Sequence, residues 1–387
     1  MIMFLSIIVS LLLVVFAVIF IASGGFLKPK YLEPFQKSYA NQFNDPRIQL
    51  ASHGLLAANG HNMQPWKIKL AADQNVFYLY ADHERLTKEV DPFARQTMIT
   101  QGTFLEYVRI AGEKLGYATD IALFPEGEYD EQNLVESMMN KPIAKITLVK
   151  KEPVNNPLYE FIFLQDTNRA AYQELQLTFD QINQLQATNT DDNITIKFFQ
   201  DEENLRKLGH YAIEGAKIES GIHRINVETE KIFRSNEYEK NKYRYGFSVE
   251  GQGTTGIMKH IMQGLLTLIP SLNNEKASAD LYVKFTQTAV ENTPAYAMMI
   301  TKDNSRIQQV KSGMLYSRLT LKAHSLGLVM QPVSQVLEEY PEMEEQYGNI
   351  HSEYAPEGST IQMFIRLGKP TIHFPQSMRR DIMDLVE

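Results

Sequence analysis

The run Ala57-Ala58-Asn59-Gly60-His61-Asn62-Met63-Gln64-Pro65-Trp66 separates two segments of different hydrophobic period. Residues 46–56 carry apolar side chains at the spacing of one helix face, whereas residues 66–70 alternate between apolar and polar. We therefore predict a helix, a tight polar turn and a strand. A turn of this kind presents amide side chains and free backbone groups at one edge of a core.

Two amide side chains of this turn are candidate ligand contacts. Asn62 and Gln64 each offer a hydrogen-bond donor and an acceptor. A ligand with both kinds of group along one edge, such as the pyrimidine ring of a flavin, matches this pair. The alternative is a turn that only caps the helix and buries Trp66.

The pattern Asn-x-Gln-Pro-Trp between a helix and a strand resembles the nitroreductase family of FMN enzymes. The subgroup it resembles more closely is the Acg-like FMN-binding oxidoreductases, which carry Ala-Pro-Ser-Gly-His-Asn-Thr-Gln-Pro-Trp. Here Ala58 replaces the usual Pro and Asn59 the usual Ser, and Asn is also a hydrogen-bonding turn residue. The resemblance implies FMN as a cofactor, with Asn59, His61, Asn62 and Gln64 in its site.

The composition is that of a globular protein with an acidic balance. The chain has 387 residues, 44% hydrophobic and 22% charged, with a net charge of -8. This charge argues against binding to nucleic acid. The absence of cysteine excludes disulfides, thiolate catalysis and cysteine-ligated metal. The histidines lack the spacing of a zinc motif, so we predict no metal site.

The N-terminus differs from the rest of the chain. Residues 1–27 carry no charged side chain and are long enough to span a bilayer. The run lacks the basic start and the cleavage site of a signal peptide, so we predict a retained single-pass anchor in the lipid bilayer. Lys28, Lys30 and Lys37 follow the run. By the positive-inside rule, they place the body in the cytoplasm.

The body is predicted to be α+β, with residues 28–45 as its linker to the anchor. Alternating and apolar runs predict strands at 66–70, 76–81, 121–124, 144–149, 194–199, 295–300 and 361–367. Helical spacing predicts helices at 46–56, 94–115, 158–164, 179–185, 202–233, 306–326 and 334–337.

The pattern of the body begins again after a proline-bearing linker at residues 152–157. Gly102 precedes Leu115-Gly116 by the same spacing at which Gly313 precedes Leu326-Gly327. An apolar strand lies before each helix, which favours a repeat over two helices that merely share a Leu-Gly end. We therefore predict two copies of one unit, residues 46–152 and 157–387.

In the resembling family, two subunits form a dimer with flavins at their interface. The resemblance therefore implies an intramolecular pseudo-dimer that is monomeric as a chain. Only the first copy carries Asn-x-Gln-Pro-Trp, and the corresponding place near Leu272–Lys276 does not. One FMN for each chain is the expectation.

The resemblance also implies that the second copy supplies the other flavin contacts. The family's Arg-Arg-Ser/Thr-x-Arg motif corresponds to Gln165-Asp166-Thr167-Asn168-Arg169, in which Thr167, Asn168 and Arg169 match its later positions. Gln165 and Asp166 stand where arginines are expected, which weakens a phosphate site there. The alternative is an ordinary helix N-cap.

Two further segments complete the expected site. Gln331, Pro332, Val333 and Ser334 lie where the family's chain crosses the flavin face near N5. Arg379 and Arg380 resemble the closing Arg-Arg of the subgroup, and arginine forks suit phosphate oxygens. The alternatives are a buried strand with a proline turn and a solvated arginine pair.

Residues 251–256 read Gly-Gln-Gly-Thr-Thr-Gly, which matches the G-x-G-x-x-G dinucleotide pattern. A Rossmann domain needs several βαβ units, and a long polar helical stretch precedes this one. By resemblance, residues 236–270 correspond to a lid over the flavin.

The main functional hypothesis is a flavin oxidoreductase. FMN would carry electrons from NAD(P)H through its N5 to a small acceptor such as a nitroaromatic or a quinone. The alternative is an FMN-sequestering or sensing protein whose lid closes off the flavin. A membrane-tethered dehalogenase is a third reading, which rests on architecture alone.

Overall fold

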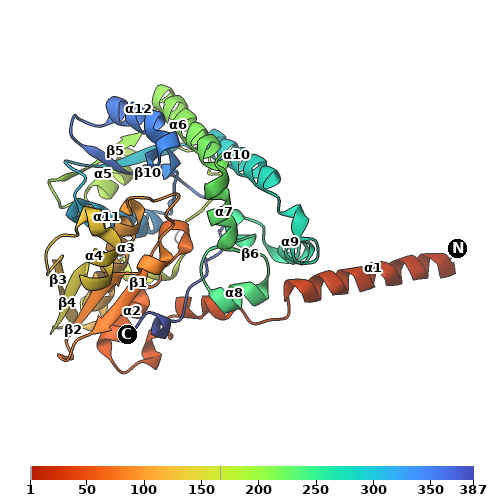
Figure 1. Cartoon of the computed structure of the whole chain (residues 1–387), viewed down its shortest axis with the longest axis horizontal. Coiled ribbons are helices and arrows are strands. Elements are labelled where there is room, and N and C mark those ends of the chain that lie inside the picture. Colours follow the sequence, from red (N-terminus) through yellow and green to blue (C-terminus); the bar gives the residue numbers. More distant parts are fainter. Residues whose placement is uncertain (1, 166) are drawn as a thin grey trace.

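The computed structural model describes residues 2–165 and 167–387. Its body holds two four-stranded antiparallel sheets with two long helices, α3 (Arg95–Leu115) and α11 (Arg306–Ser325), between them (Figure 1). The first sheet contains β1 (Trp66–Leu70), β2 (Val76–Ala81), β3 (Tyr117–Leu123) and β4 (Ala144–Lys150). The second contains β5 (Ile194–Phe199), β8 (Ala295–Thr301), β9 (Val329–Pro332) and β10 (Thr360–Gly368). The body is therefore α+β, as predicted.

The two sheets share one topology. Their strand orders are β1-β2-β4-β3 and β5-β8-β10-β9, so the first, second, fourth and third strand of each set lie side by side. In both sets the long helix lies between the second and third strand, and a short helix precedes the first: α2 (Pro46–Gly54) or α5 (Phe179–Gln186). The 59–66 turn lies between α2 and β1, so its equivalent in the second set is residues 187–193, between α5 and β5. The prediction that placed this equivalent near Leu272 is therefore wrong.

The sets differ by a long insertion between β5 and β8. It contains α6 (Glu202–Ser220), α7 (His223–Lys231), β6 (Phe233–Arg234), α8 (Glu237–Tyr243), β7 (Phe247–Ser248), α9 (Gly256–Leu268) and α10 (Glu275–Glu291). The helix predicted over 202–233 is divided in two near Gly221. The strand that precedes the G-x-G-x-x-G run is β7, which has two residues. A strand this short does not match a dinucleotide-binding βαβ unit.

Helices α3 and α11 cross at two glycines. A Cβ on Gly102 would lie 1.8 Å from the carbonyl oxygen of Val310, and a Cβ on Gly313 would lie 1.8 Å from that of Ile99. Val310 belongs to the core of the first sheet, and Ile99 to the core of the second. The contact is thus reciprocal, as at a two-fold interface. Backbones can approach this closely only where no side chain intervenes.

A buried carboxylate reinforces the crossing. Glu106 of α3 is fully buried and accepts hydrogen bonds from Arg109 at 2.5 Å and from Arg318 of α11 at 2.8 Å. Burial alone would raise the pKa of Glu106, but the two guanidinium groups lower it. A buried charge that is paired in this way ties the two helices together and fixes their register.

Two peripheral segments connect distant parts of the chain. The C-terminal arm, residues 369–387, returns to the first sheet, where the amide of Ile68 donates to the carbonyl of Leu385 at 2.7 Å. Helix α12 (Glu344–Tyr354) covers the second sheet, and α4 (Leu134–Asn140) packs on the first. The predicted helix near 158–164 is a 3-10 helix, Tyr159–Phe163.

Helix α1 (Ile2–Ser23) projects from the body (Figure 1). Among the described residues, Met3–Ser23 is the one helix long and apolar enough to cross a membrane, by length and composition. A signal sequence would meet the same criteria. The last turn of α1 packs on α9 of the insertion.

Gly313→Ala is predicted to destabilise the protein by about 3 kcal/mol or more, because its methyl group cannot fit against the Ile99 carbonyl. Gly348→Ala is the matched control. Gly348 lies within α12, and a Cβ there has no described atom within 4 Å. That change is expected to add about 0.5–1 kcal/mol. Thermal unfolding of the full chain in detergent measures both, and equal melting temperatures for the two variants would contradict the crossing.

Candidate functional site

The 59–66 turn has a strained backbone. His61, Asn62 and Gln64 have φ values of 52°, 52° and 53°, in the left-handed region. Each such residue costs about 1–3 kcal/mol and persists only when its surroundings hold it. The side chain of Asn59 accepts from the amide of Gln64 at 2.8 Å, and the hydroxyl of Thr100 accepts from the amide of Gly60 at 3.1 Å. Strain of this kind is concentrated at ligand sites and other functional segments.

The amides of Asn62 and Gln64 are engaged within the protein. The Asn62 amide donates to the carbonyls of Gly246 at 3.2 Å and Met378 at 3.1 Å. Gln64 is fully buried, donates to the carbonyl of Arg244 at 2.9 Å, and accepts from the amide of Arg380 at 2.8 Å. Both side chains therefore fasten the C-terminal arm and the insertion to the turn. The predicted donor and acceptor edge is not free at Gln64.

Arg379 belongs to the same fastening network. It is fully buried, and its guanidinium donates to the Asn62 side chain at 2.9 Å and to the carbonyls of Leu56 and Ala57 at 2.9 and 3.0 Å. Arg380 is also buried and donates to the carbonyl of Asp384 at 2.8 Å. Burial lowers the pKa of Arg380 to about 10. In this conformation the two arginines hold the C-terminal arm in place.

A cavity of about 980 Å³ lies beside the turn, between the two sheets and the insertion. Small-molecule sites are typically about 300–1,000 Å³, so this cavity is at the large end. Nine of the thirteen predicted cofactor-binding residues line it: Asn59, His61, Asn62, Thr167, Arg169, Gln331, Pro332, Val333 and Ser334. Three segments far apart in the sequence therefore meet at one cavity. The remaining four, Gln64, Asn168, Arg379 and Arg380, are buried in the protein around it.

The 167–169 segment divides into structural and accessible groups. Asn168 is buried, and its amide side chain donates to the carbonyl of Ile372 at 3.1 Å, so it holds the C-terminal arm. Arg169 is exposed, with one long hydrogen bond of 3.5 Å to the carbonyl of Gly251. Asp166 lies outside the described residues. The guanidinium group of Arg169 can therefore donate further hydrogen bonds to an anionic ligand.

The 331–334 segment forms a firm wall. The Ser334 hydroxyl lies 3.0 Å from the carbonyl of Phe364, and the amide of Val333 donates to the same carbonyl at 2.9 Å. The Gln331 side chain accepts from Arg366 at 2.8 Å. Arg366 is itself fully buried and stacks on the ring of Tyr172 at 3.8 Å. These contacts hold Pro332, the last residue of β9, and Val333, which follows it, against the cavity.

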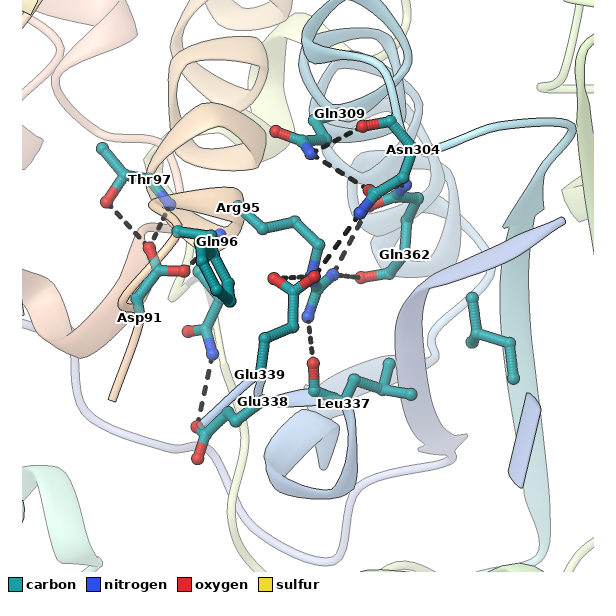
Figure 2. Close-up of polar contacts among 12 residues, drawn as sticks. Asp91, Arg95, Gln96, Thr97, Asn304, Gln309, Leu337, Glu338, Glu339 and Gln362 are labelled. Carbon is teal, nitrogen blue, oxygen red and sulfur yellow. Dashed lines mark hydrogen bonds and ion pairs between the residues drawn. The ribbon is translucent and has the colours of Figure 1, made fainter. Parts of the chain in front are cut away.

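Helix α3 supplies a polar stripe that the sequence prediction missed. Gln96, Thr100 and Thr103 all line the cavity. Their spacing of four and three places them on one helix face, so an amphipathic reading of residues 94–115 would have found them. Asp91 caps this end of α3, accepting from the amides of Gln96 at 3.0 Å and Thr97 at 2.9 Å (Figure 2).

Figure 2 shows Arg95, which is buried, at the centre of a polar network at the start of α3. Its guanidinium donates to the carbonyls of Gln362 at 2.8 Å and Leu337 at 2.7 Å, both from the second half of the chain. Gln96 donates to the carboxylate of Glu338 at 3.2 Å. The acidic run at residues 338–345 has the composition of a surface segment. Its first residue, Glu338, is nevertheless buried.

Two carboxyl groups in the cavity wall favour their protonated form. Burial raises the pKa of Glu219 to about 7, and its carboxylate accepts from the Tyr282 hydroxyl at 2.8 Å. Burial and the nearby charge of Glu219 raise the pKa of Glu338 well above its usual range. One oxygen of Glu338 has no hydrogen-bond partner among the described residues. Burial thus stabilises the protonated form of carboxyl groups in this wall, which is a feature that functional sites often share.

His61 is a neutral group at the cavity edge. Desolvation and the positive charge of Arg169 lower the pKa of His61 to about 4. Its ring lies 5.5 Å from that of Phe247 in the insertion. Its Nδ1 is buried and, within the described chain, has no hydrogen-bond partner. His61 is therefore a free polar contact at neutral pH.

A buried ion cluster fastens the predicted lid, residues 236–270. Lys240 is fully buried; it contacts Glu237 at 3.0 Å and also pairs with Glu250. The Tyr31 hydroxyl, from the segment that follows α1, donates to Glu237 at 2.7 Å. Burial alone would raise the pKa of Glu237, but the charge of Lys240 and its hydrogen bonds lower it to about 2. The predicted lid is thus attached to the segment that follows α1.

Comparisons with known proteins give a limited result. Searches of protein-family models and of curated proteins found no match. Among solved structures, the chain is similar to the NADPH:FMN oxidoreductase from Vibrio harveyi complexed with NAD+, at 14% identity over 58% of this chain and 73% of that one, with a TM-score of 0.33. It is also similar to a nitroreductase with bound FMN from Desulfitobacterium hafniense DCB-2, at 9% identity over 59% and 96%, with a TM-score of 0.34. Likeness at this level does not assign a function.

Gln64→Ala is predicted to destabilise the protein by roughly 3 kcal/mol, because buried partners in Arg244 and Arg380 lose their hydrogen bonds. Gln74→Ala, at an exposed position before β2, is the control and should change stability little. Thermal unfolding checks both. A Gln64→Ala protein as stable as the control would show that the turn is not held by this amide.

Glu219→Gln is predicted to change the dependence of stability on pH. Since the folded pKa of Glu219 is raised to about 7, the folded state binds more protons than the unfolded state between about pH 4.5 and 7. Wild-type stability therefore falls as pH rises through this window, by about 3 kcal/mol. The variant should gain melting temperature over wild type at pH 8 and little at pH 5. Glu203→Gln, exposed on the same helix, should give the same difference at both pH values.

Proposed function

We propose that this protein is a membrane-anchored FMN-binding oxidoreductase that transfers electrons from NAD(P)H to a small acceptor of the nitroaromatic or quinone type. The observation that carries the proposal is the meeting of three predicted flavin segments at one cavity. Asn59–Asn62, Thr167–Arg169 and Gln331–Ser334 are separated by more than a hundred residues in each interval, yet all contribute to its wall.

The cavity has the donor set that a flavin needs. Val333, Pro332 and Ile99 offer an apolar wall for a flat ring, and Gln96 and Thr100 offer polar groups beside it. The unpartnered Nδ1 of His61 offers a hydrogen bond to a ring edge. The exposed guanidinium of Arg169 suits a phosphate group. The direct contacts are thus assigned to His61 and Arg169, whereas Asn62, Gln64, Arg379 and Arg380 position them.

FMN, when bound, supplies hydride and electron transfer through its ring. The protein's own residues bind, orient and exclude water. The strand β9 and the strained turn hold the two walls of the cavity, and the insertion covers it. Glu219 and Glu338 lie in the wall with raised pKa values, so they can hold a proton for a reduced acceptor.

The architecture supports a fused pseudo-dimer of the nitroreductase type. The two sheets have one strand order, and α3 and α11 cross reciprocally at Gly102 and Gly313. The cavity lies beside this crossing, where a subunit interface would lie in a dimer. The segment equivalent to the 59–66 turn, residues 187–193, carries no Gln-Pro-Trp. We therefore propose one FMN for each monomeric chain. The apolar run of α1 and the lysines after it support a place for α1 in the bilayer and for the body in the cytoplasm.

A second candidate function is sequestration of FMN with little turnover. The ion cluster of Glu237, Lys240 and Glu250 holds the lid against the segment that follows α1. A lid fastened by buried charges would open rarely, because separation leaves an uncompensated charge. A protein that is yellow when purified but is not bleached by NADH or NADPH without oxygen would favour this function.

Arg169→Gln is predicted to weaken FMN binding by roughly tenfold or more, through loss of a charge-assisted hydrogen bond to phosphate. Arg206→Gln, at an exposed position of α6, is the control and should bind as wild type does. The measurement is FMN titration of the full chain in detergent, followed by flavin fluorescence. A wild-type protein that is colourless and cannot be reconstituted with FMN would end the proposal and its alternative together.

A further inference from the structure

Helix α9 carries an apolar stripe that the protein leaves uncovered. Ile257 and Met258 at its start are 55% and 53% exposed, and Leu268 and Ile269 at its end are 49% and 47% exposed. Their spacing places them along one side of the helix. From His260 to Asn274 the sequence contains no Asp, Glu, Lys or Arg. Isolated apolar residues on a surface are ordinary, but a continuous apolar stripe marks an interaction site.

The stripe begins where α1 ends. Gly264 of α9 lies against the backbone of α1, so close that a Cβ there would be 2.2 Å from the carbonyl oxygen of Ile19. The ring of Phe20 lies 5.2 Å from that of His260, and the Ser23 hydroxyl is 3.3 Å from the same ring. Figure 1 shows α9 beside the body-side end of α1. The contact therefore lies in the last turns of α1.

This placement sets the depth of α9. A helix of 22 residues is roughly 33 Å long, close to the thickness of the hydrocarbon core of a bilayer. If α1 crosses that core, its last turn lies at the boundary with the headgroups. Helix α9, which packs on that turn, lies at the same boundary. A stripe of exposed Ile, Met and Leu side chains is the face that an interfacial helix turns to the acyl chains.

The cavity opens toward the same side. Met262 and Leu266 of α9 line it, and so do Leu281 and Phe285 of α10. Leu272, Leu281 and Phe285 are also 50%, 44% and 42% exposed. They therefore stand at the mouth, where the cavity meets the surface. The mouth carries these apolar side chains beside a few polar ones, such as Asn273 and Ser278, whereas the far end of the cavity carries Asn59, Gln96 and Arg169.

We propose that α9 and the turn into α10 lie in the interface of the bilayer that α1 crosses, and that the mouth between α9 and α10 admits a quinone with a long apolar chain directly from the lipid. The quinone class rests on the proposed function; the membrane placement of α9 does not. The head group of the quinone would enter toward the polar end, and its chain would remain between the two helices. The overall reaction is NAD(P)H + H⁺ + quinone → NAD(P)⁺ + hydroquinone, in which two electrons reduce the quinone and both its oxygens gain a proton.

The placement is tested by depth measurement on the full chain, which has no native cysteine. Single variants Ile257→Cys and Leu268→Cys are labelled with an environment-sensitive fluorophore and inserted in phosphatidylcholine vesicles. Phe179→Cys, 80% exposed on α5 and on the opposite side of the body, is the control (Figure 1). A spin-labelled phosphatidylcholine should quench the labels at 257 and 268 and leave the label at 179 unchanged.

The opposite result would overturn the placement. Labels at 257 and 268 that are quenched by aqueous iodide and not by the lipid quencher would show a helix exposed to water. Labels shielded from both quenchers would show that another protein surface, such as a second copy of this chain, covers the stripe. Neither result depends on flavin or activity.

The ligand is tested by comparing two quinones in the same vesicles. The double variant Leu268→Gln/Ile269→Gln changes the stripe and no residue that lines the cavity. It should slow reduction of a long-chain isoprenoid quinone by NADPH roughly tenfold, because insertion of α9 is weakened, and leave reduction of a water-soluble benzoquinone unchanged. Phe179→Gln should alter neither rate.

The outcomes separate this inference from the proposed function. Equal slowing of both quinones would overturn the membrane route while leaving a flavin reductase. If wild type reduces neither quinone but NADPH or NADH bleaches its flavin, the quinone route is overturned and a flavin reductase remains. If the flavin is not bleached either, electron transfer from NAD(P)H falls as well, and the placement of α9 is decided by the quenching alone.

Discussion

The close crossing of α3 and α11 is the contact on which the rest of the structure depends. Gly102 and Gly313 let two backbones meet where any side chain would hold them apart. The crossing places Val310 in one core and Ile99 in the other, so neither core is complete without the other helix. It also brings Thr100 of α3 and Tyr316 of α11 to the same cavity wall. The absence of side chains at Gly102 and Gly313 thus lets the two halves pack together and brings both helices to the cavity.

A second level of organisation comes from polar groups that work over long sequence distances. Asn62 and Gln64 hold the carbonyl of Met378, and Arg379 holds the carbonyls of Leu56 and Ala57. A strained turn is maintained in this way by a segment more than three hundred residues away. The side chains of Asn62 and Gln64 serve as these fasteners, whereas His61 of the same turn has one ring nitrogen without a hydrogen-bond partner in the described chain.

The insertion links the cavity to α1 and the segment that follows it. Its ion cluster joins Tyr31, just after α1, to Glu237 and Lys240 of α8, and α9 packs on α1 itself. The elements that cover the cavity are therefore those that contact α1. In a bilayer this arrangement would give the cavity a lipid-facing side and a water-facing side, which suits a reaction between a soluble reductant and a lipid-dissolved acceptor.

The sequence by itself determined most of the secondary structure. The strands at 66–70, 76–81 and 194–199 were predicted at their observed bounds, because alternation and β-branched or aromatic content are local properties. The correspondence between Gly102 and Gly313 was also predicted, because each precedes a Leu-Gly pair by the same number of residues. The tertiary structure alone decided which of the predicted site residues are bonded within the protein. Gln64 and Arg379 have the chemistry of a binding residue, but partners such as the carbonyl of Arg244 meet them only after folding. The burial of Glu338 and the position of α9 on α1 were decided in the same way, because burial and contact depend on packing between segments that the local pattern does not connect.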